Sequence, residues 1–247
     1  SAYRELRQAL RLDPRNVDAL YYLSRLCAAL SNIEYQKLYA LAPDSARVHQ
    51  LMAESYRAQR NLAKAEEEYR AALAADPRSV EVLVALGDLL RSQFRFDDAI
   101  AYYSRAAEAA PRNYDSAYGL GACYLYKEEP QRAIEYLQRA LEIDSNSAAA
   151  RLALGDAWLR AGRPADAVTE LKAATTLVPN MRQAFTLLAR AYNRLGQAEQ
   201  AKAALSKAQE LTKKERAERE ALLTSDDLAV TPSPAPAASG QPEGPNE

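Results

Sequence analysis

Histidine, cysteine and glycine are scarce in this chain of 247 residues. The chain contains one histidine, His49, two cysteines, Cys27 and Cys123, and eight glycines. A zinc site would need further His or Cys ligands, and a Ser-His-Asp triad would need an exposed histidine. The glycines form no GxxxxGK loop that could cradle a phosphate. We therefore expect no enzymatic activity, with no catalytic residue, no metal site and no cofactor.

The chain also lacks an excess of charge of one sign and a long apolar run. Its 32 basic and 33 acidic residues give a formal net charge of −1. Without a polybasic stripe, neither nucleic acid nor an anionic membrane surface is an expected partner. No apolar run approaches the roughly 20 residues of a membrane-spanning helix. We expect no direct membrane insertion.

What the chain has in abundance is alanine, and the alanines recur every 34 residues. One series is Ala65, Ala99, Ala133, Ala167 and Ala201, and a second follows seven residues later at Ala72, Ala106, Ala140, Ala174 and Ala208. A fixed period of this length is the signature of a repeat architecture. Repeat chains typically provide binding surfaces.

Other positions follow the same register. Small residues preceded by an apolar one recur at Ala53, Gly87, Gly121, Gly155 and Ala189, and large apolar residues follow at Tyr56, Leu90, Tyr124, Trp158 and Tyr192. Proline closes most repeats, at Pro43, Pro77, Pro111 and Pro179. From the first residue to about Lys213 the chain thus resembles the tetratricopeptide repeats, whose pattern combines these features. The resemblance implies an all-α, right-handed solenoid of helix-turn-helix repeats.

The residues of each position also explain the helices physically. Apolar residues at spacings of three and four predict two amphipathic helices per repeat. Small residues at fixed positions let the paired helices approach closely, and the prolines end the second helix. Gly162 and Gly196 lie where the first helix ends, a position that tolerates positive φ. Arg60, Phe94 and Glu128 occupy that position elsewhere, and we expect a different turn geometry there.

The register divides the chain into five segments. Five full repeats occupy 46–215, and positions within them are counted from residues 46, 80, 114, 148 and 182. Residues 1–16 match the second helix of an incomplete repeat, and 17–45 form a repeat that is five residues short. We expect 209–223 to be a polar capping extension of the last helix and 224–247, rich in Pro, Ala and Ser, to be disordered. Because the pattern begins in mid-repeat, we expect either further sequence upstream or a partner chain over this edge.

The scarce residues have structural interpretations in this register. Cys27 and Cys123 lie nearly three repeats apart, too far for the roughly 7 Å that a disulfide requires. We expect both to be small buried hydrophobes. His49 shares its repeat position with Leu83, Ala117 and Phe185, so we expect a packed structural histidine.

The resemblance implies that the first helices line a concave groove, in which positions 2, 5, 9, 12 and 13 face a bound peptide. The candidate partner-binding residues are Tyr21, Tyr22, Arg25, Val84, Asp88, Tyr118, Tyr126, Leu152 and Arg190. Among them, Val84, Tyr118 and Leu152 at position 5 form an apolar strip that is unusual for exposed residues. The alternative is that these side chains simply fill the inner wall of the superhelix.

Position 9 carries acids in the inner repeats, at Glu54, Asp88 and Asp156, and arginines at both ends, at Arg25 and Arg190. We expect its acids to be paired within their own helices, Glu54 with Arg57, Asp88 with Arg91 and Asp156 with Arg160. A carboxylate clamp for acidic C-terminal peptides, known in this family, would need Lys and Asn at positions 5 and 9. Val84 and Asp88 are the wrong residues for it, so this mode is disfavoured.

These observations favour a non-catalytic protein-protein interaction scaffold that binds a partner protein or peptide segment in its groove. The alternative is a structural or assembly subunit that docks into a larger complex through its N-terminal edge or convex face. Homo-oligomerisation stays open. The excess of arginine over lysine indicates a bacterial source, and the cysteines leave cytoplasm and periplasm equally open.

The register itself is testable at Ala133. Replacing this alanine with leucine should overpack a helix pair and lower the free energy of unfolding by about 1–3 kcal/mol. Thermal unfolding of Ala133→Leu beside the parent chain measures the change, and an unchanged melting curve would contradict the register.

Overall fold

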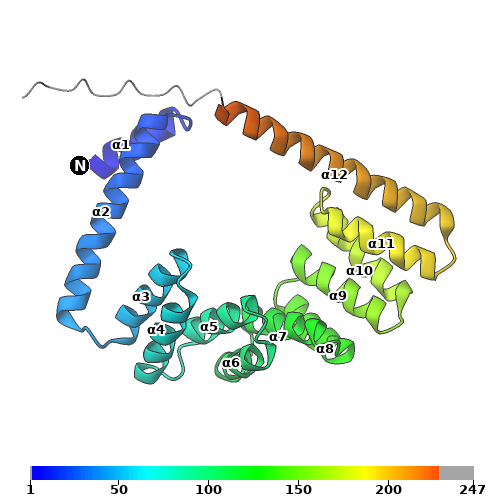
Figure 1. Cartoon of the computed structure of the whole chain (residues 1–247), viewed down its shortest axis with the longest axis horizontal. Helices are drawn as coiled ribbons and strands as arrows, with labels where there is room; N and C mark the ends of the chain where they lie inside the picture. The colour runs from blue at the N-terminus through cyan, green and yellow to red at the C-terminus, as the bar shows by residue number, and fades with distance from the viewer. Residues whose placement is uncertain (1, 228–247) are drawn as a thin grey trace, which may run out of the picture.

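The computed structural model describes residues 2–227, with side chains as far as residue 221. All regular secondary structure in this part of the chain is helical, which confirms the expected all-α solenoid (Figure 1). The helices are α1 (Ala2–Leu12), α2 (Val17–Leu41), α3 (Ala46–Ala58), α4 (Leu62–Ala75), α5 (Val80–Ser92), α6 (Phe96–Ala109), α7 (Tyr114–Tyr126), α8 (Pro130–Ile143), α9 (Ala148–Arg160), α10 (Pro164–Leu177), α11 (Arg182–Arg194) and α12 (Ala198–Asp227).

From α3 onward the helices form antiparallel pairs that stack into an arc. Each odd-numbered helix packs against the even-numbered helix that follows it, and each even-numbered helix packs against the next odd-numbered one. Successive first helices, α5, α7, α9 and α11, also touch one another. The first helices therefore form one continuous layer, and the second helices form another (Figure 1).

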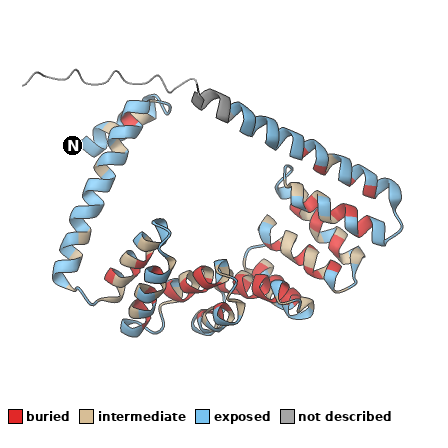
Figure 2. Ribbon diagram, in the orientation of Figure 1, coloured by how far each residue is buried: buried red, intermediate tan, exposed pale blue. Residues whose placement is uncertain are grey.

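The core lies between the two helices of each pair. Alanines of the first repeat series, such as Ala133 and Ala167, are fully buried. Gly121 shows how close the helices come, because a Cβ atom placed there would lie 2.5 Å from Cγ of Leu137. Buried residues are concentrated in the paired helices and are sparse in α2 (Figure 2). Small residues on one helix thus admit large side chains from the other, as the sequence predicts.

The turns between paired helices correct one prediction. Gly162 and Gly196 have the expected positive φ, 76° and 71°, but Arg60, Phe94 and Glu128 adopt the same conformation at 60°, 61° and 60°. In all five turns a backbone N–H donates to the carbonyl oxygen of the residue five positions earlier. The pairs are Asn61 to Tyr56, Arg95 to Leu90, Glu129 to Tyr124, Arg163 to Trp158 and Gln197 to Tyr192. This bond is the mark of the Schellman motif. It fixes the left-handed residue whatever its side chain.

The shortened repeat at 17–45 also differs from expectation. The sequence predicts two half-repeats there, whereas the structure has the single 25-residue helix α2. Counted forward from 17 and backward from 45, the five missing residues correspond to 59–63 of the next repeat, which contain the left-handed turn. Without that turn and without Gly or Pro between 17 and 41, nothing interrupts the helical hydrogen bonds. The two halves therefore form one continuous helix.

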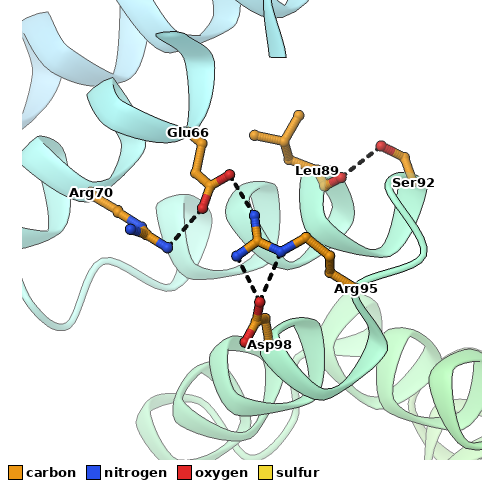
Figure 3. Close-up of polar contacts among 6 residues, drawn as sticks. All are labelled: Glu66, Arg70, Leu89, Ser92, Arg95 and Asp98. Carbon is orange, nitrogen blue, oxygen red and sulfur yellow. Dashed lines mark hydrogen bonds and ion pairs between the residues drawn. The ribbon is translucent and has the colours of Figure 1, made fainter. Parts of the chain in front are cut away.

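An ion network joins two consecutive repeats on the side of the second helices. Arg95, at the start of α6, contacts Glu66 of α4 at 2.7 Å and Asp98 at 2.6 Å, and Glu66 also contacts Arg70 at 2.7 Å (Figure 3). Because Glu66 is only 14 % exposed and has two partners, this network is less screened than a surface pair. It links the repeats 46–79 and 80–113.

The C-terminal helix extends further than predicted. The four helices α2, α4, α6 and α10 end two residues before Pro43, Pro77, Pro111 and Pro179, as expected. Helix α12, in contrast, continues through 209–223 to Asp227 and so includes the first residues of the segment 224–247 for which we expect disorder. The remainder of that segment lies outside the described residues.

The turn geometry predicts opposite effects for two substitutions. Glu128→Gly should raise the free energy of unfolding by about 1 kcal/mol, because glycine adopts positive φ without the steric cost. Gly162→Glu should lower it by a similar amount. Urea unfolding followed by circular dichroism measures both, and a destabilised Glu128→Gly variant would contradict local strain at this position.

Candidate partner-binding surface

A hollow opens on the layer of first helices. It has a volume of about 580 Å³ and is bounded by residues of α7, α9 and α11 together with Met181. Its apolar lining includes Tyr118, Leu125, Leu152, Met181 and Leu187. Three successive repeats thus contribute to one apolar concavity, which is the usual character of a ligand-binding site.

A second hollow of about 240 Å³ continues the first toward α5. The two share Tyr118, Leu125, Ala153 and Asp156, and the second adds Arg91, Ala122, Tyr126 and Arg160. We refer to the two hollows together as the inner groove. It runs across α5, α7, α9 and α11, and its centre is Tyr118.

Aromatic side chains extend the inner groove at one end. Tyr126 is 62 % exposed and stacks on Phe96, with ring centroids 4.9 Å apart and an angle of 8° between the rings. Phe94 meets Phe96 edge to face at 6.1 Å and is itself 74 % exposed. A bulky residue with positive φ and an exposed ring is uncommon. Such an aromatic surface beside a hollow is typical of interaction sites.

The charged residues of the groove are bonded to one another. Asp88 and Arg91 pair at 3.0 Å, and Tyr103 of α6 joins them by accepting a hydrogen bond from Arg91 Nε at 3.1 Å and donating one to Asp88 at 2.7 Å. Burial and the bond to Asp88 raise the pKa of Tyr103 well above its usual range. Asp156 pairs with Arg160 at 2.9 Å. The pairing expected within these helices is present.

Glu54 is the exception among the acids at position 9. Its carboxylate accepts a hydrogen bond from Nε2 of Gln50 at 3.1 Å, and its expected pairing with Arg57 is not seen among the described contacts. Gln50 also accepts a hydrogen bond from Arg47, which reaches Glu81 of the next repeat at 3.0 Å. The uncharged amide of Gln50, one turn earlier in the helix, has thus taken the place of Arg57.

The structure brings together only part of the candidate site. Tyr118 and Leu152 line the first hollow, and Tyr118 and Tyr126 line the second. Asp88 lies beside the groove, held by Arg91, whereas Val84 packs half-buried against the core. Arg190 is exposed on α11 and lines neither hollow.

The remaining three candidates form a separate aromatic surface on α2. Tyr21 and Tyr22 are 53 % and 59 % exposed, and their rings meet edge to face at 5.3 Å. Arg25 donates a hydrogen bond to the Tyr21 hydroxyl at 3.2 Å. None of the three lines the inner groove.

Sequence reasoning missed Met181, Leu187, Phe94 and Phe96. Met181 precedes α11, and Leu187 is at a helix position that small residues occupy in most repeats, so neither belongs to the peptide-facing positions. A usable signal existed only for Phe94. Phenylalanine at a turn position filled elsewhere by glycine or a charged residue has no local structural reason.

The single histidine and the two cysteines lie outside the inner groove. His49 Nδ1 lies 2.7 Å from Glu68, and at the same two repeat positions Arg151 contacts Glu170 at 2.8 Å, so His49 belongs to a recurrent contact between paired helices. Cys123 is buried as expected, but Cys27 is exposed, because the fused α2 leaves its helix face uncovered. Within the described residues no cluster of His, Cys, Asp and Glu could hold a metal ion.

Sequence comparison agrees with this geometry. A tetratricopeptide repeat pattern matches residues 50–114, 84–148 and 124–182, and a second pattern of the same repeat matches 159–225. The first three spans together cover more than half of the chain. The chain belongs to the tetratricopeptide repeat family. As a member of it, the protein is a scaffold for protein-protein interaction. A search of curated proteins gives no significant match.

Solved structures with the same fold include three bacterial repeat proteins. MamA is 25 % identical with a TM-score of 0.64, over 67 % of this chain and 96 % of MamA. YrrB, described as a TPR protein with an unusual peptide-binding site, is 25 % identical with a TM-score of 0.63, over 72 % and 91 %. PilF of Pseudomonas aeruginosa shares the fold at 23 % identity and a TM-score of 0.64, over 83 % and 90 %. A bacterial origin of this chain is consistent with these neighbours.

Between residues 2 and 227, the helices are too short or too polar to cross a membrane.

The buried thiol yields a prediction on reactivity and pH. Burial raises the pKa of Cys123 to about 12 from an ordinary value near 9. In a Cys27→Ser background, a thiol reagent at pH 8 should leave Cys123 unmodified until urea unfolds the chain, because the thiolate is the reactive form.

The same shift affects stability. The neutral Cys123 thiol contributes fully to the free energy of unfolding below about pH 9, where the thiol of the unfolded chain is also protonated. This contribution is lost as the pH rises toward about 12. The urea midpoint should therefore fall more between pH 8 and pH 10.5 in the Cys27→Ser variant than in the double variant Cys27→Ser, Cys123→Ala. Equal falls in the two backgrounds would contradict the shift.

Proposed function

We propose that the inner groove binds an apolar or aromatic segment of a partner protein, and that the protein acts as a non-catalytic adaptor through it. The observation that carries the proposal is the hollow of about 580 Å³, which three successive repeats line with Tyr118, Leu152, Met181 and Leu187. Large apolar side chains around a concavity provide the pockets into which interface anchors insert.

The charges around the groove favour an uncharged segment. Asp156 is paired with Arg160, Asp88 with Arg91, and Arg182 at the rim with Glu215 at 3.2 Å. A charged peptide group would have to displace one of these partners, leaving the displaced charge to find another. An apolar side chain gains burial without disturbing any pair. Selectivity should therefore come from shape and apolar contact.

A relative supports peptide binding by this fold. YrrB is described as a TPR protein with an unusual peptide-binding site, and it aligns with 72 % of this chain. From that description we apply to the present protein only the class of ligand, which is a peptide segment. The apolar character of that segment rests on the residues of the present groove.

The N-terminal edge favours a second candidate function, docking into a larger assembly. Among the large apolar residues of α2, Val17, Tyr22 and Leu41 are 75 %, 59 % and 84 % exposed. This surface does not include the inner groove. Substitutions in the groove therefore separate the two functions.

A peptide library displayed against the immobilised protein tests the groove. We expect enriched peptides to carry aromatic or large aliphatic anchors. Leu152→Ala should weaken their binding by about 30-fold, since truncation of an anchor contact costs about 2 kcal/mol or more. Leu141→Ala is the matched control, because Leu141 is likewise a half-buried leucine but lies outside the groove on the second helix α8.

Fluorescence polarisation with one enriched peptide gives the affinities, and circular dichroism confirms that each variant is folded. Enrichment of acidic peptides, or equal loss of affinity in Leu152→Ala and Leu141→Ala, would contradict binding in the inner groove.

A further inference from the structure

Helix α2 exposes an unusual amount of apolar surface. Leu20, Ile33 and Tyr39 are 49 %, 49 % and 46 % exposed, and Val17 and Leu41 at its ends are more exposed still. The helix extends away from the stacked pairs (Figure 1), and little of its surface is buried (Figure 2). Its two halves nevertheless carry the residues of a repeat. Residues 17–29 match a first helix and 30–41 a second helix, joined without the turn.

The fusion leaves both halves without their usual neighbour. In a complete repeat the first helix packs along the second, as α7 does along α8, and also contacts the next first helix, as α7 contacts α9. In α2 the first half cannot fold back on the second, because the turn residues are missing. Residues 30–41 and the following helix α3 therefore both lack a first helix beside them.

The body of the protein shows where that helix is missing. Leu86, Leu120, Leu154 and Leu188 at repeat position 7 are at most 4 % exposed, but the equivalent Met52 is only half-buried. A hollow of about 660 Å³ lies between α2 and α3, lined by Tyr35, Leu38, Leu51, Met52 and Tyr56 among others. Its place, beside a second helix and the next first helix, is the place that a first helix occupies in the complete repeats.

We propose that a second copy of this chain fills the hollow. In the resulting two-fold dimer, residues 17–29 of each copy pack antiparallel along residues 30–41 and α3 of the other. A single exchange supplies both missing neighbours at once, and each copy carries one exposed first helix and one vacant place for it. Loss of a hinge loop is a recognised route to such exchange of identical elements.

The complete repeats fix the register of this contact. Repeat position 8 meets position 24 in three of them, at Gly87 with Tyr103, Gly121 with Leu137 and Gly155 with Leu171. The equivalent residues in α2 are Ser24 and Tyr35. Ser24 of one copy should therefore lie against Tyr35 of the other, which places the two-fold axis between Ala29 and Leu30, with Ala28 and Ser31 nearest to it on the contacting helix face. Small side chains at the crossing allow close helix approach.

Ser24 gives a sharp test because it is exposed in the single chain. We expect sedimentation equilibrium of the full chain between about 1 and 100 µM to show twice the chain mass of 27.2 kDa. Ser24→Arg should weaken dimerisation by on the order of 100-fold, because a large side chain cannot fit against Tyr35. Gln36→Arg, which adds the same charge at an exposed position on the same helix, should remain dimeric.

Restoring the turn provides an independent variant. Insertion of the five residues QRNLA, copied from 59–63, between Ala29 and Leu30 should let the first half fold back within its own chain. The product should be a monomer with unchanged helical circular dichroism.

Cys27 reports the contact directly. It occupies repeat position 11, where Leu90 and Tyr124 are buried in the complete repeats. Alkylation of Cys27 should therefore be at least about tenfold slower in the dimer than in Ser24→Arg. A mass of 27.2 kDa at every concentration would overturn the proposal. A dimer that persists in both Ser24→Arg and the insertion variant would overturn it too, since the copies would then meet elsewhere. Neither result bears on peptide binding in the inner groove.

Discussion

The structure depends on one contact, between a small residue on the first helix of a repeat and a large side chain on the second. Tyr103 shows what this contact achieves. A Cβ atom at Gly87 of α5 would lie 2.8 Å from the Tyr103 ring, and one at Gly119 of α7 would lie 2.5 Å from it. The ring is therefore held between two successive first helices, and its hydroxyl is bonded to Asp88 and Arg91. One buried side chain of the outer layer thus sets the spacing of the inner layer.

The groove follows from that spacing. Because the second helices occupy the outer layer, the first helices meet one another along the inner face, and only side chains that point away from the paired helix can reach it. Tyr118 and Leu152 do so from consecutive repeats. Further links hold this face in place, since Arg160 donates to the backbone carbonyl of Leu125, and Arg194 donates to that of Leu159 one repeat later. Arg160, which lines the groove, and Arg194 are used in this way to join neighbouring helices.

Most of the fold could be predicted from the 34-residue period, because each repeat position has one packing role. Small residues such as Ala133 and Gly121, for example, recur only where two paired helices approach closely. The turns at Arg60, Phe94 and Glu128 could not, since a backbone hydrogen bond fixes their conformation and leaves no mark in the side chains. The two halves of α2 are fused because the five missing residues are those of the turn. The length of the shortened repeat alone does not show which five residues are missing. Tyr118, Tyr126 and Leu152 of the candidate site meet in one groove, but Met181 and Leu187 join them only through the stacking of α11 on α9.

The two proposals reinforce each other when the consequences for binding are considered. A groove whose charges are already paired offers mainly apolar contact, and one short apolar segment buried in a hollow of about 580 Å³ gives a limited free energy of binding. Pairing through α2 would place two such grooves in one particle. A partner with two apolar segments, or an oligomeric partner, would then bind the second groove at a high effective concentration, which raises overall affinity by about 10²–10⁴ without a new contact. The lost turn of the shortened repeat would thereby turn a weak single site into a selective scaffold for multivalent partners.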